Sequence, residues 1–204
     1  TTIGWRFTNP ALSKLHHPFS MGETAENVAE KWNISRERQD AFALSSQEKW
    51  LAAQKRGAFK NEIIPVEIPQ RKKDPIIFDT DEHPRLSSLE TLAGLKPAFR
   101  DNGTVTAGNA SGINDGAACA LVVSEEMLKR YNLTPMARIV SFGVAGVDPA
   151  YMGIGPVPAT QKALSRAGLQ IGDMDVMELN EAFAAQVLAS MDELGANPSK
   201  VNLN

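Results

Sequence analysis

The sequence runs Thr104-Val-Thr-Ala-Gly-Asn-Ala-Ser-Gly-Ile-Asn-Asp-Gly-Ala117 and then Ala118-Cys-Ala-Leu-Val-Val123. The first stretch consists mainly of small residues, which let a backbone approach a ligand or another surface closely. The second is an apolar run long enough for one buried strand. Together they predict a close-packed loop that leads into a strand over residues 117–123.

Strands and helices alternate after this loop. The predicted elements are a helix capped by Ser124 that ends near Tyr131, a strand over residues 138–144, a helix from Pro158 to Gly168, a strand over residues 176–179 and a helix from Ala182 to Gly195. The last of these has the clearest amphipathic pattern, on Phe183, Val187, Met191 and Leu194. Such alternation predicts βαβ units and a mainly parallel sheet, which is an α/β fold.

The residues before the loop predict helices and irregular connections. Thr24 is placed to cap a helix with a buried stripe of Ala25, Val28, Ala29 and Trp32. Ser35 is placed to cap a second helix, which Lys55 and Arg56 end before Gly57.

Three further segments complete this region. Residues 62–68 predict an edge strand, because Pro65 has no N–H to donate to a ladder. Residues 69–85 are charged and interrupted by prolines, which predicts a loop. Residues 88–95 predict a short helix. Composition changes near residue 115, between a helical part and a strand–helix part.

Length and composition predict an ordinary globular protein. The chain has 204 residues, enough for one domain or two small ones, with 43% hydrophobic and 22% charged residues. No apolar run has the length of roughly 18 residues that a membrane span needs. The start shows no signal peptide and has no Met, so we expect that it is not the native N-terminus.

Charge and cysteine content exclude several classes of function. The net charge of −3 gives no reason to expect nucleic acid as a partner. Arg71-Lys-Lys73 is the clearest basic run and is either a solvated loop or an anion contact. One cysteine excludes an internal disulfide and fits a reducing cytoplasm. With three scattered histidines, it offers no metal-ligand spacing.

Asn180 is the first candidate for chemistry, because it stands where a predicted strand gives way to a helix. Its carboxamide can donate hydrogen bonds to an oxygen that becomes negative in a reaction. An Asn before a helix can equally be the N-cap, and position alone leaves both interpretations open. Glu181 fits the helix dipole or a supporting hydrogen bond better than acid–base chemistry.

Ser111 and Cys119 are the other polar candidates. The Ser111 hydroxyl can bind amide groups of a ligand, or it can simply belong to a turn. Cys119 lies inside an apolar run, so we expect a buried thiol that acts as a small hydrophobe rather than a nucleophile. His16, His17 and His83 are expected on the surface or in loops.

Two strings resemble the thiolases, which make and break carbon–carbon bonds between acyl groups on coenzyme A. They are Thr-Ala-Gly-Asn-Ala-Ser-Gly over residues 106–112 and Asn-Glu-Ala-Phe-Ala over residues 180–184. The resemblance implies that Asn180 belongs to an oxyanion hole for the thioester. It also implies that Ala107 and Ser111 contact coenzyme A.

The same resemblance implies a wall around the pantetheine and acyl groups. Its members are Phe99, Met152, Met21, Ala182 and Phe183, for all of which core packing is the alternative. Many relatives have a histidine before the residue that matches Met21, whereas Ser20 stands here, which puts the contact at position 20 in doubt. Arg85 is a candidate for the nucleotide phosphates, with a solvated loop arginine as the alternative.

The implied fold consists of two similar α/β halves, a mixed sheet flanked by helices, with a helical, loop-rich domain inserted in the first half. Residues 1–114 would form the insertion, 115–132 the end of the first half and 133–204 the start of the second. Thiolases are dimers or tetramers, so the full-length protein is expected to be a homodimer or homotetramer. Acyl-CoA and CoA are the expected partners, with no tightly bound cofactor, metal, nucleic acid or membrane.

The implied reaction is CoA-dependent thiolysis of a 3-ketoacyl-CoA to acetyl-CoA and a shortened acyl-CoA, or the reverse condensation. This chain contains no match to the nucleophilic cysteine, the Gly-His-Pro segment or the second cysteine, so it is expected to be inactive alone. A non-catalytic CoA-binding module and a structural fragment are the alternatives. The opening Thr-Ile-Gly-Trp-Arg-Phe and the segment from Asp81 to Arg85 look most like degradative 3-oxoadipyl-CoA thiolases.

Overall fold

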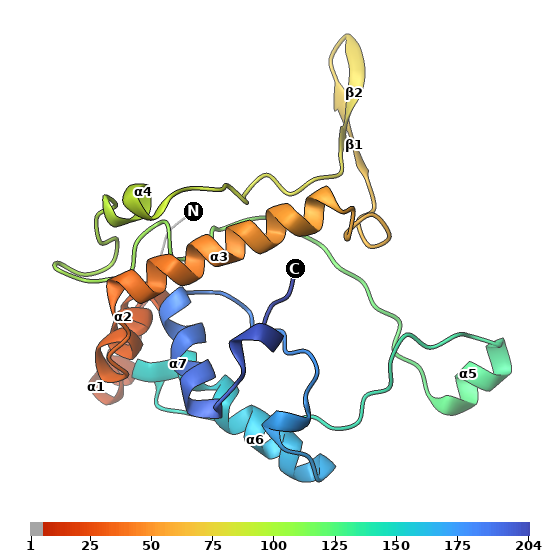
Figure 1. The fold of residues 1–204 in the computed structure, drawn as a ribbon. Coiled ribbons are helices and arrows are strands. Elements are labelled where there is room, and N and C mark those ends of the chain that lie inside the picture. Colours follow the sequence, from red (N-terminus) through yellow and green to blue (C-terminus); the bar gives the residue numbers. More distant parts are fainter. Residues whose placement is uncertain (1–5) are drawn as a thin grey trace.

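The computed structural model describes residues 6–204, and helices dominate it (Figure 1). Residues 2–5, which form most of the opening string Thr-Ile-Gly-Trp-Arg-Phe, therefore lie outside the described residues. The α-helices are α1 Pro10–Leu15, α2 Met21–Lys31, α3 Arg36–Lys55, α4 Leu89–Ala93, α5 Glu125–Tyr131, α6 Pro156–Ala167 and α7 Ala184–Leu194. The 3-10 helices are η1 Pro149–Ile154, η2 Ile171–Asp173 and η3 Pro198–Lys200. The strands are β1 Val66–Gln70 and β2 Lys73–Phe78.

Helix α2 begins earlier than the sequence predicts. Its N-cap is Ser20, whose side chain accepts from the Glu23 N–H while the Glu23 carboxylate accepts from the Ser20 N–H. The predicted cap, Thr24, is wrong, because this reciprocal capping box already satisfies the orphan donors one turn earlier. Thr24 lies inside the helix, and its hydroxyl donates to the Met21 carbonyl oxygen.

Most other helix boundaries follow the local signals in the sequence, but α6 begins at Pro156 rather than Pro158, and α7 begins at Ala184 rather than Ala182. Ser35 caps α3, Ser88 caps α4 and Ser124 caps α5, as predicted. Helix α3 ends at Lys55 as predicted. Gly168 and Gly195 adopt the left-handed conformation after α6 and α7. This conformation is the one that glycine tolerates best at a helix end.

The core lies between α2, α3 and α7. Val28 and Ala29 of α2 pack with Ile34 and with residues Ala185, Leu188 and Ala189 of α7. A second cluster joins Val187 and Met191 of α7 to Ala196 and Val201, with Phe42 of α3 against both clusters. Every residue of α7 from Ala184 to Met191 is buried, so its covered surface exceeds the predicted stripe. Helices α2 and α3 are therefore fixed against α7.

The hairpin β1–β2 corrects the prediction of a loop over residues 69–85. The strands pair antiparallel, with Ile68 opposite Ile76, and project beyond the end of α3 (Figure 1). Lys72 turns the chain with a φ of 66°. Pro69 lies at the irregularity between Ile68 and Gln70. Pro75 lies within β2. A two-stranded ribbon has two free edges, so prolines interrupt it less than they would a larger sheet.

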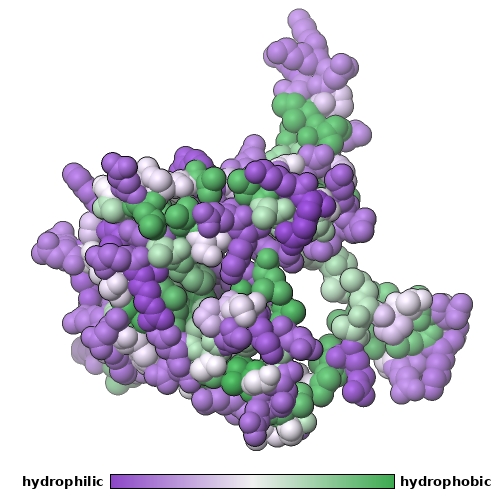
Figure 2. Space-filling model, in the orientation of Figure 1, coloured by the Kyte–Doolittle hydropathy of each residue, from purple (hydrophilic) through white to green (hydrophobic). Residues whose placement is uncertain are grey.

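The predicted strands 117–123, 138–144 and 176–179 do not form as strands in the described residues. Segments 117–123 and 138–144 are extended, and their side chains are largely exposed, as at Leu121 (79%) and Ile139 (70%). Figure 2 shows green apolar surface along the arms that lead to α5. A strand requires a neighbouring strand to which its backbone is hydrogen-bonded, and residues 6–204 provide none for these two arms.

The third predicted strand is reduced to one bridge. Met177 pairs with Val201 in parallel, and the Met177 N–H donates to the Lys200 carbonyl oxygen over 2.8 Å. The arm 138–144 instead lies against α6. Its carbonyl oxygens at Phe142 and Val144 accept from Arg166 and Lys162.

Among the described residues, none of the helices combines the length and the apolar character that a membrane span requires.

Candidate active site

The two motif strings meet in space, although 67 residues separate them in the sequence. Ala110 forms an antiparallel bridge with Phe183. The Ser111 N–H donates to the Ala182 carbonyl oxygen over 2.9 Å, and the Ala184 N–H donates to the Asn109 carbonyl oxygen over 2.9 Å. Three consecutive residues of one string are therefore paired with three consecutive residues of the other.

A buried carboxylate fixes the two residues that precede the first string. Glu26 of α2 is 3% exposed, and it accepts from the backbone N–H groups of Thr104 and Val105 over 2.8–3.0 Å. The Thr104 hydroxyl donates to the same carboxylate. A Cβ at Gly103 would lie 2.2 Å from Glu26 Oε1, so glycine is required for this approach. The structural role of Glu26 was not predicted. The sequence contains an indication of it, because a charged residue next to the buried stripe of a helix requires a partner.

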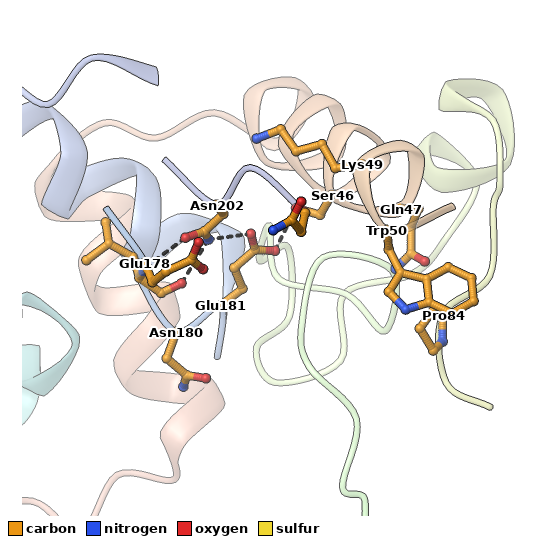
Figure 3. A pocket seen from close by; sticks show the side chains of 11 residues that line it. Ser46, Gln47, Lys49, Trp50, Pro84, Glu178, Asn180, Glu181 and Asn202 are labelled. Atoms are coloured by element: carbon orange, nitrogen blue, oxygen red, sulfur yellow. Dashed lines mark hydrogen bonds between the residues drawn. The ribbon is translucent and has the colours of Figure 1, made fainter. Parts of the chain in front are cut away.

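Asn180 is exposed and does not cap α7. The N-cap of that helix is Phe183, three residues later, so the N-cap interpretation of Asn180 is wrong. Among residues 6–204, no group accepts a hydrogen bond from the Asn180 amide. Its carboxamide points away from the Glu181 carboxylate (Figure 3). Its donors therefore remain available for a ligand.

Glu181 has a supporting role, as predicted. Its carboxylate accepts from Ser46 Oγ of α3 and from Asn202 Nδ2, each over 2.6 Å. Asn202 also donates to the Leu179 carbonyl oxygen over 2.8 Å and accepts from the Leu179 N–H. These bonds tie the segment before α7 to α3 and to the end of the chain, which limits the freedom of the adjacent Asn180.

A cavity of about 590 Å³ opens between α3 and this segment. Lys49 and Trp50 line it on the side of α3, and Asn180 and Glu181 line it on the other (Figure 3). Ser111 is not among its lining residues in the described part of the chain. The structure thus joins the Ser111 and Asn180 segments through the backbone hydrogen bond from Ser111 to Ala182.

Phe99 and Phe183 of the predicted apolar wall are in contact. Their ring centroids are 6.0 Å apart at 86°, an edge-to-face arrangement. A Cβ at Gly22 would lie 2.2 Å from the Phe99 ring, so this ring covers the first turn of α2 beside Met21. Phe99 therefore lies between Phe183 and the first turn of α2, where Met21 precedes Gly22, and the half-buried Ala182 precedes Phe183.

Met152 and Met21 expose large apolar areas. Met152 lies in η1, which packs against α2 and α7, and is 45% exposed, whereas Met21 is 55% exposed. A Cβ at the neighbouring Gly153 would lie 2.9 Å from Gln186 Cγ of α7. The close approach at Gly153 holds Met152 at the edge of the core. Because Met152 and Met21 are both about half exposed, core packing does not account for either side chain.

Arg85 and Ala107 are exposed, as is Ser111. The backbone N–H of Arg85 donates to Gln47 Oε1 of α3 over 2.7 Å, which fixes this part of the loop. A Cβ at Gly112 would lie 2.6 Å from the His83 ring, so the segment before Arg85 reaches the residue after Ser111. His83 is exposed, in agreement with the predicted loop position.

Cys119 is exposed, which corrects the prediction of a buried thiol. The arm over residues 117–123 has no neighbouring strand among the described residues, so nothing covers this side chain. Within the same residues, no group of three or more His, Cys, Asp or Glu side chains lies close enough to hold a metal ion.

Two family models match the chain. The model of the thiolase N-terminal domain matches residues 6–126, and that of the thiolase C-terminal domain matches residues 133–204. The chain belongs to the thiolase family. It spans about half the length of the curated relatives it matches.

Similar proteins include two types of thiolase. An acetyl-CoA acetyltransferase of Allochromatium vinosum is 56% identical over 91% of this chain and 48% of that protein. A beta-ketoadipyl-CoA thiolase of Acinetobacter baylyi is 51% identical over 100% of this chain and 51% of its own length.

Solved structures show the thiolase fold. The chain superposes on the acetyl-CoA acetyltransferase of Bacillus anthracis with a TM-score of 0.88 and 47% identity, over 98% of this chain and 53% of the other. It superposes on human mitochondrial 3-ketoacyl-CoA thiolase in complex with CoA with a TM-score of 0.83 and 48% identity, over 92% and 46% of the two chains. The predicted family and α/β fold class are confirmed.

Proposed function

We propose that the native gene product containing these residues is a thiolase. It cleaves a 3-ketoacyl-CoA with free CoA to acetyl-CoA and a shortened acyl-CoA, or runs the reverse condensation. The observation that carries this proposal is the pairing of Asn109–Ser111 with Ala182–Ala184. This pairing puts the proposed CoA-binding string beside the string that carries the proposed oxyanion donor.

Asn180 is the catalytic residue of this proposal. As the bond between C2 and C3 of the substrate breaks, negative charge develops on the thioester oxygen of the departing acetyl-CoA. Preorganised amide donors stabilise such charge without reorganisation during the reaction. The exposed carboxamide of Asn180 and the fixed position of its neighbour Glu181 support this role.

The remaining residues bind substrate in this proposal. Ser111 and Ala107 contact the pantetheine arm of CoA, which passes a loop of small residues. Phe99, Phe183, Ala182, Met21 and Met152 form the apolar wall, for which the Phe99–Phe183 contact and the exposed methionines give support. The exposed guanidinium of Arg85 binds nucleotide phosphate.

This chain alone is proposed to be inactive. Thiolysis needs a cysteine thiolate that accepts the acyl group and a base that moves the proton. Cys119 is the chain's one cysteine, and it lies on an arm outside the elements that position Asn180. The 204 residues therefore supply the oxyanion donor and part of the CoA surface, but no nucleophile.

A 3-oxoadipyl-CoA is the proposed substrate, in line with the name of the Acinetobacter baylyi relative. Acetoacetyl-CoA is the second candidate, because other relatives of comparable identity are named acetyl-CoA acetyltransferases. A cytoplasmic location and a homo-oligomer stay predictions.

The test is a thiolysis assay on the native gene product with CoA and each of these two substrates. We expect CoA-dependent loss of the 3-ketoacyl-CoA, with one acetyl-CoA formed per 3-oxoadipyl-CoA consumed and two formed per acetoacetyl-CoA consumed. The 204-residue chain serves as the matched control and is expected to show no turnover. A native gene product that consumes neither substrate would contradict the proposed function, and turnover by the chain alone would contradict its inactivity.

A further inference from the structure

Asn109 stands at the centre of a buried hydrogen-bond network beside the proposed CoA-binding residues. It is 3% exposed, and every polar atom of its side chain is used. Its Oδ1 accepts from the Thr106 N–H over 2.8 Å, while its Nδ2 donates to Asp40 Oδ1 over 2.9 Å and to the Thr104 carbonyl oxygen over 3.1 Å. Asn109 therefore closes the turn that presents Ala107.

Asp40 of α3 is held from its other side by a cation. It is 3% exposed, and its Oδ2 accepts from Arg36 Nε over 2.7 Å. The Arg36 guanidinium also donates to the Leu92 and Leu95 carbonyl oxygens at the end of α4, over 2.7 and 2.9 Å. The Asp40 carboxylate is thus fixed in a buried site by two donors, Arg36 and Asn109.

The backbone of Asn109 continues the network into α7. Its carbonyl oxygen accepts from the N–H of Ala184, the first residue of that helix, over 2.9 Å. Helix-initial N–H groups have no partner inside the helix, so Asn109 satisfies one of them. One residue therefore connects α3, the turn with Ala107 and the segment that follows Asn180.

We propose that Asn109, held by Asp40, is a positioning residue that fixes the CoA-binding turn relative to the Asn180 segment. This inference rests on the proposed function, because it assigns Ala107 and Ser111 to CoA. Ala107 and Ser111 stand two residues before and after Asn109, so a displaced Asn109 moves both. The expected consequence is weaker CoA binding, beyond any loss of stability.

Exchange of the two side chains tests the network. In Asp40→Asn, an NH2 group replaces one of the two carboxylate oxygens, so either Arg36 or Asn109 faces a donor instead of an acceptor. In Asn109→Asp, two carboxylates face each other. The exchanged pair Asp40→Asn/Asn109→Asp restores a donor between the positions, although the carboxylate introduced at position 109 faces the Thr104 carbonyl oxygen unfavourably.

The measurement is the dissociation constant of CoA for the native gene product, by titration calorimetry. Because a buried group left without its partner destabilises the turn that it holds, we expect Asp40→Asn to weaken CoA binding about tenfold, which corresponds to about 1.4 kcal/mol. Asn109→Asp is expected to weaken it at least as much, and the exchanged pair to return to within about threefold of wild type.

Leu188→Ala in α7 is the matched control. Leu188 is buried in the core but does not belong to the network, so this variant is expected to lower the melting temperature without changing the CoA dissociation constant. If Asp40→Asn behaves like Leu188→Ala, the network only supports the fold and the proposal is wrong.

Should the single variants not fold, amide hydrogen exchange of the wild-type protein replaces them. CoA is then expected to slow exchange at the Ser111 and Ala184 N–H groups, and unchanged rates at both would contradict the proposal.

Failure of the proposed function gives a different result. Wild-type protein that binds CoA but performs no thiolysis overturns the proposed function and leaves the positioning role intact. Unchanged CoA affinity in Asp40→Asn and Asn109→Asp, with active wild-type protein, overturns the positioning role alone.

Discussion

The Ser111 N–H donates a hydrogen bond to the carbonyl oxygen of Ala182 over 2.9 Å. This bond belongs to a short antiparallel pairing around Ala110 and Phe183. The backbone of Ser111 is therefore fixed, whereas its hydroxyl stays exposed and makes no hydrogen bond to the described residues.

Ser111→Ala should raise the KM for CoA about tenfold with little change in melting temperature. The backbone bond to Ala182 survives the substitution, and only the hydroxyl, one hydrogen bond to the ligand, is lost. Steady-state kinetics of the native gene product would measure this. An unchanged KM for CoA would remove Ser111 from the binding site.

Gly22→Ala should destabilise the protein by about 1–3 kcal/mol, because the added methyl group overlaps the Phe99 ring. Displacement of Phe99 also breaks its contact with Phe183 and should raise the KM for the 3-ketoacyl-CoA. Gly172→Ala is the control, since a Cβ there meets nothing within 4 Å. Equal melting temperatures for the two variants would count against the close packing.

The capping box of α2 should make stability depend on pH. The Ser20 N–H and hydroxyl hold the pKa of Glu23 below its ordinary value of 4.5. Because the folded pKa is lower than the unfolded pKa, this contribution is fully present above about pH 4.5 and is lost as pH falls through the lowered value.

Glu23→Ala should therefore lower the unfolding free energy by about 0.5 kcal/mol at pH 7, with a smaller difference in acid. Glu23→Gln is the control, because its amide oxygen can still accept from the Ser20 N–H. Thermal melts at pH 7 and below pH 4.5 compare the three proteins. A difference for Glu23→Ala that grows in acid would contradict the assignment.

Packing rather than the surface ion pair should hold α3 to α7. The Arg38 guanidinium binds both oxygens of Asp192, but both side chains are nearly half exposed, so Arg38→Gln should change stability by less than about 1 kcal/mol. Val187→Ala removes a fully buried side chain that packs in the second cluster and should lower stability by about 2 kcal/mol. Denaturant melts that reverse this order would show that the ion pair dominates.

Helix boundaries could be predicted from the sequence because their determinants are local. Ser35, Ser88 and Ser124 bond N–H groups three residues away, and Gly168 and Gly195 end helices by their own backbone conformation. The true cap of α2 also has a local signal, because Ser20 and Glu23 have the spacing of a capping box.

Strands were predicted less well because a strand depends on partners elsewhere in the chain. The run 118–123 has strand composition, but within the described residues no second strand lies beside it. The hairpin was not predicted, because Pro69 and Pro75 indicated a loop. A two-stranded ribbon tolerates these prolines at its free edges.

The candidate site was predictable to the level of its motif strings. The pairing of Ala110 with Phe183 could not be predicted, because no local pattern encodes contact between distant segments. The structural roles of Glu26, Asp40 and Asn109 were not predicted for a related reason. The role of a buried polar side chain depends on its hydrogen-bond partners, and the fold determines those partners.

The rate of thiolysis by Asn180→Ala in the native gene product tests the central claim most directly. Loss of one oxyanion donor should lower kcat about a hundredfold or more, while Asn197→Ala, an exposed asparagine outside the site, should leave it unchanged. A wild-type kcat in folded Asn180→Ala protein would contradict the claim that this amide stabilises the developing negative charge.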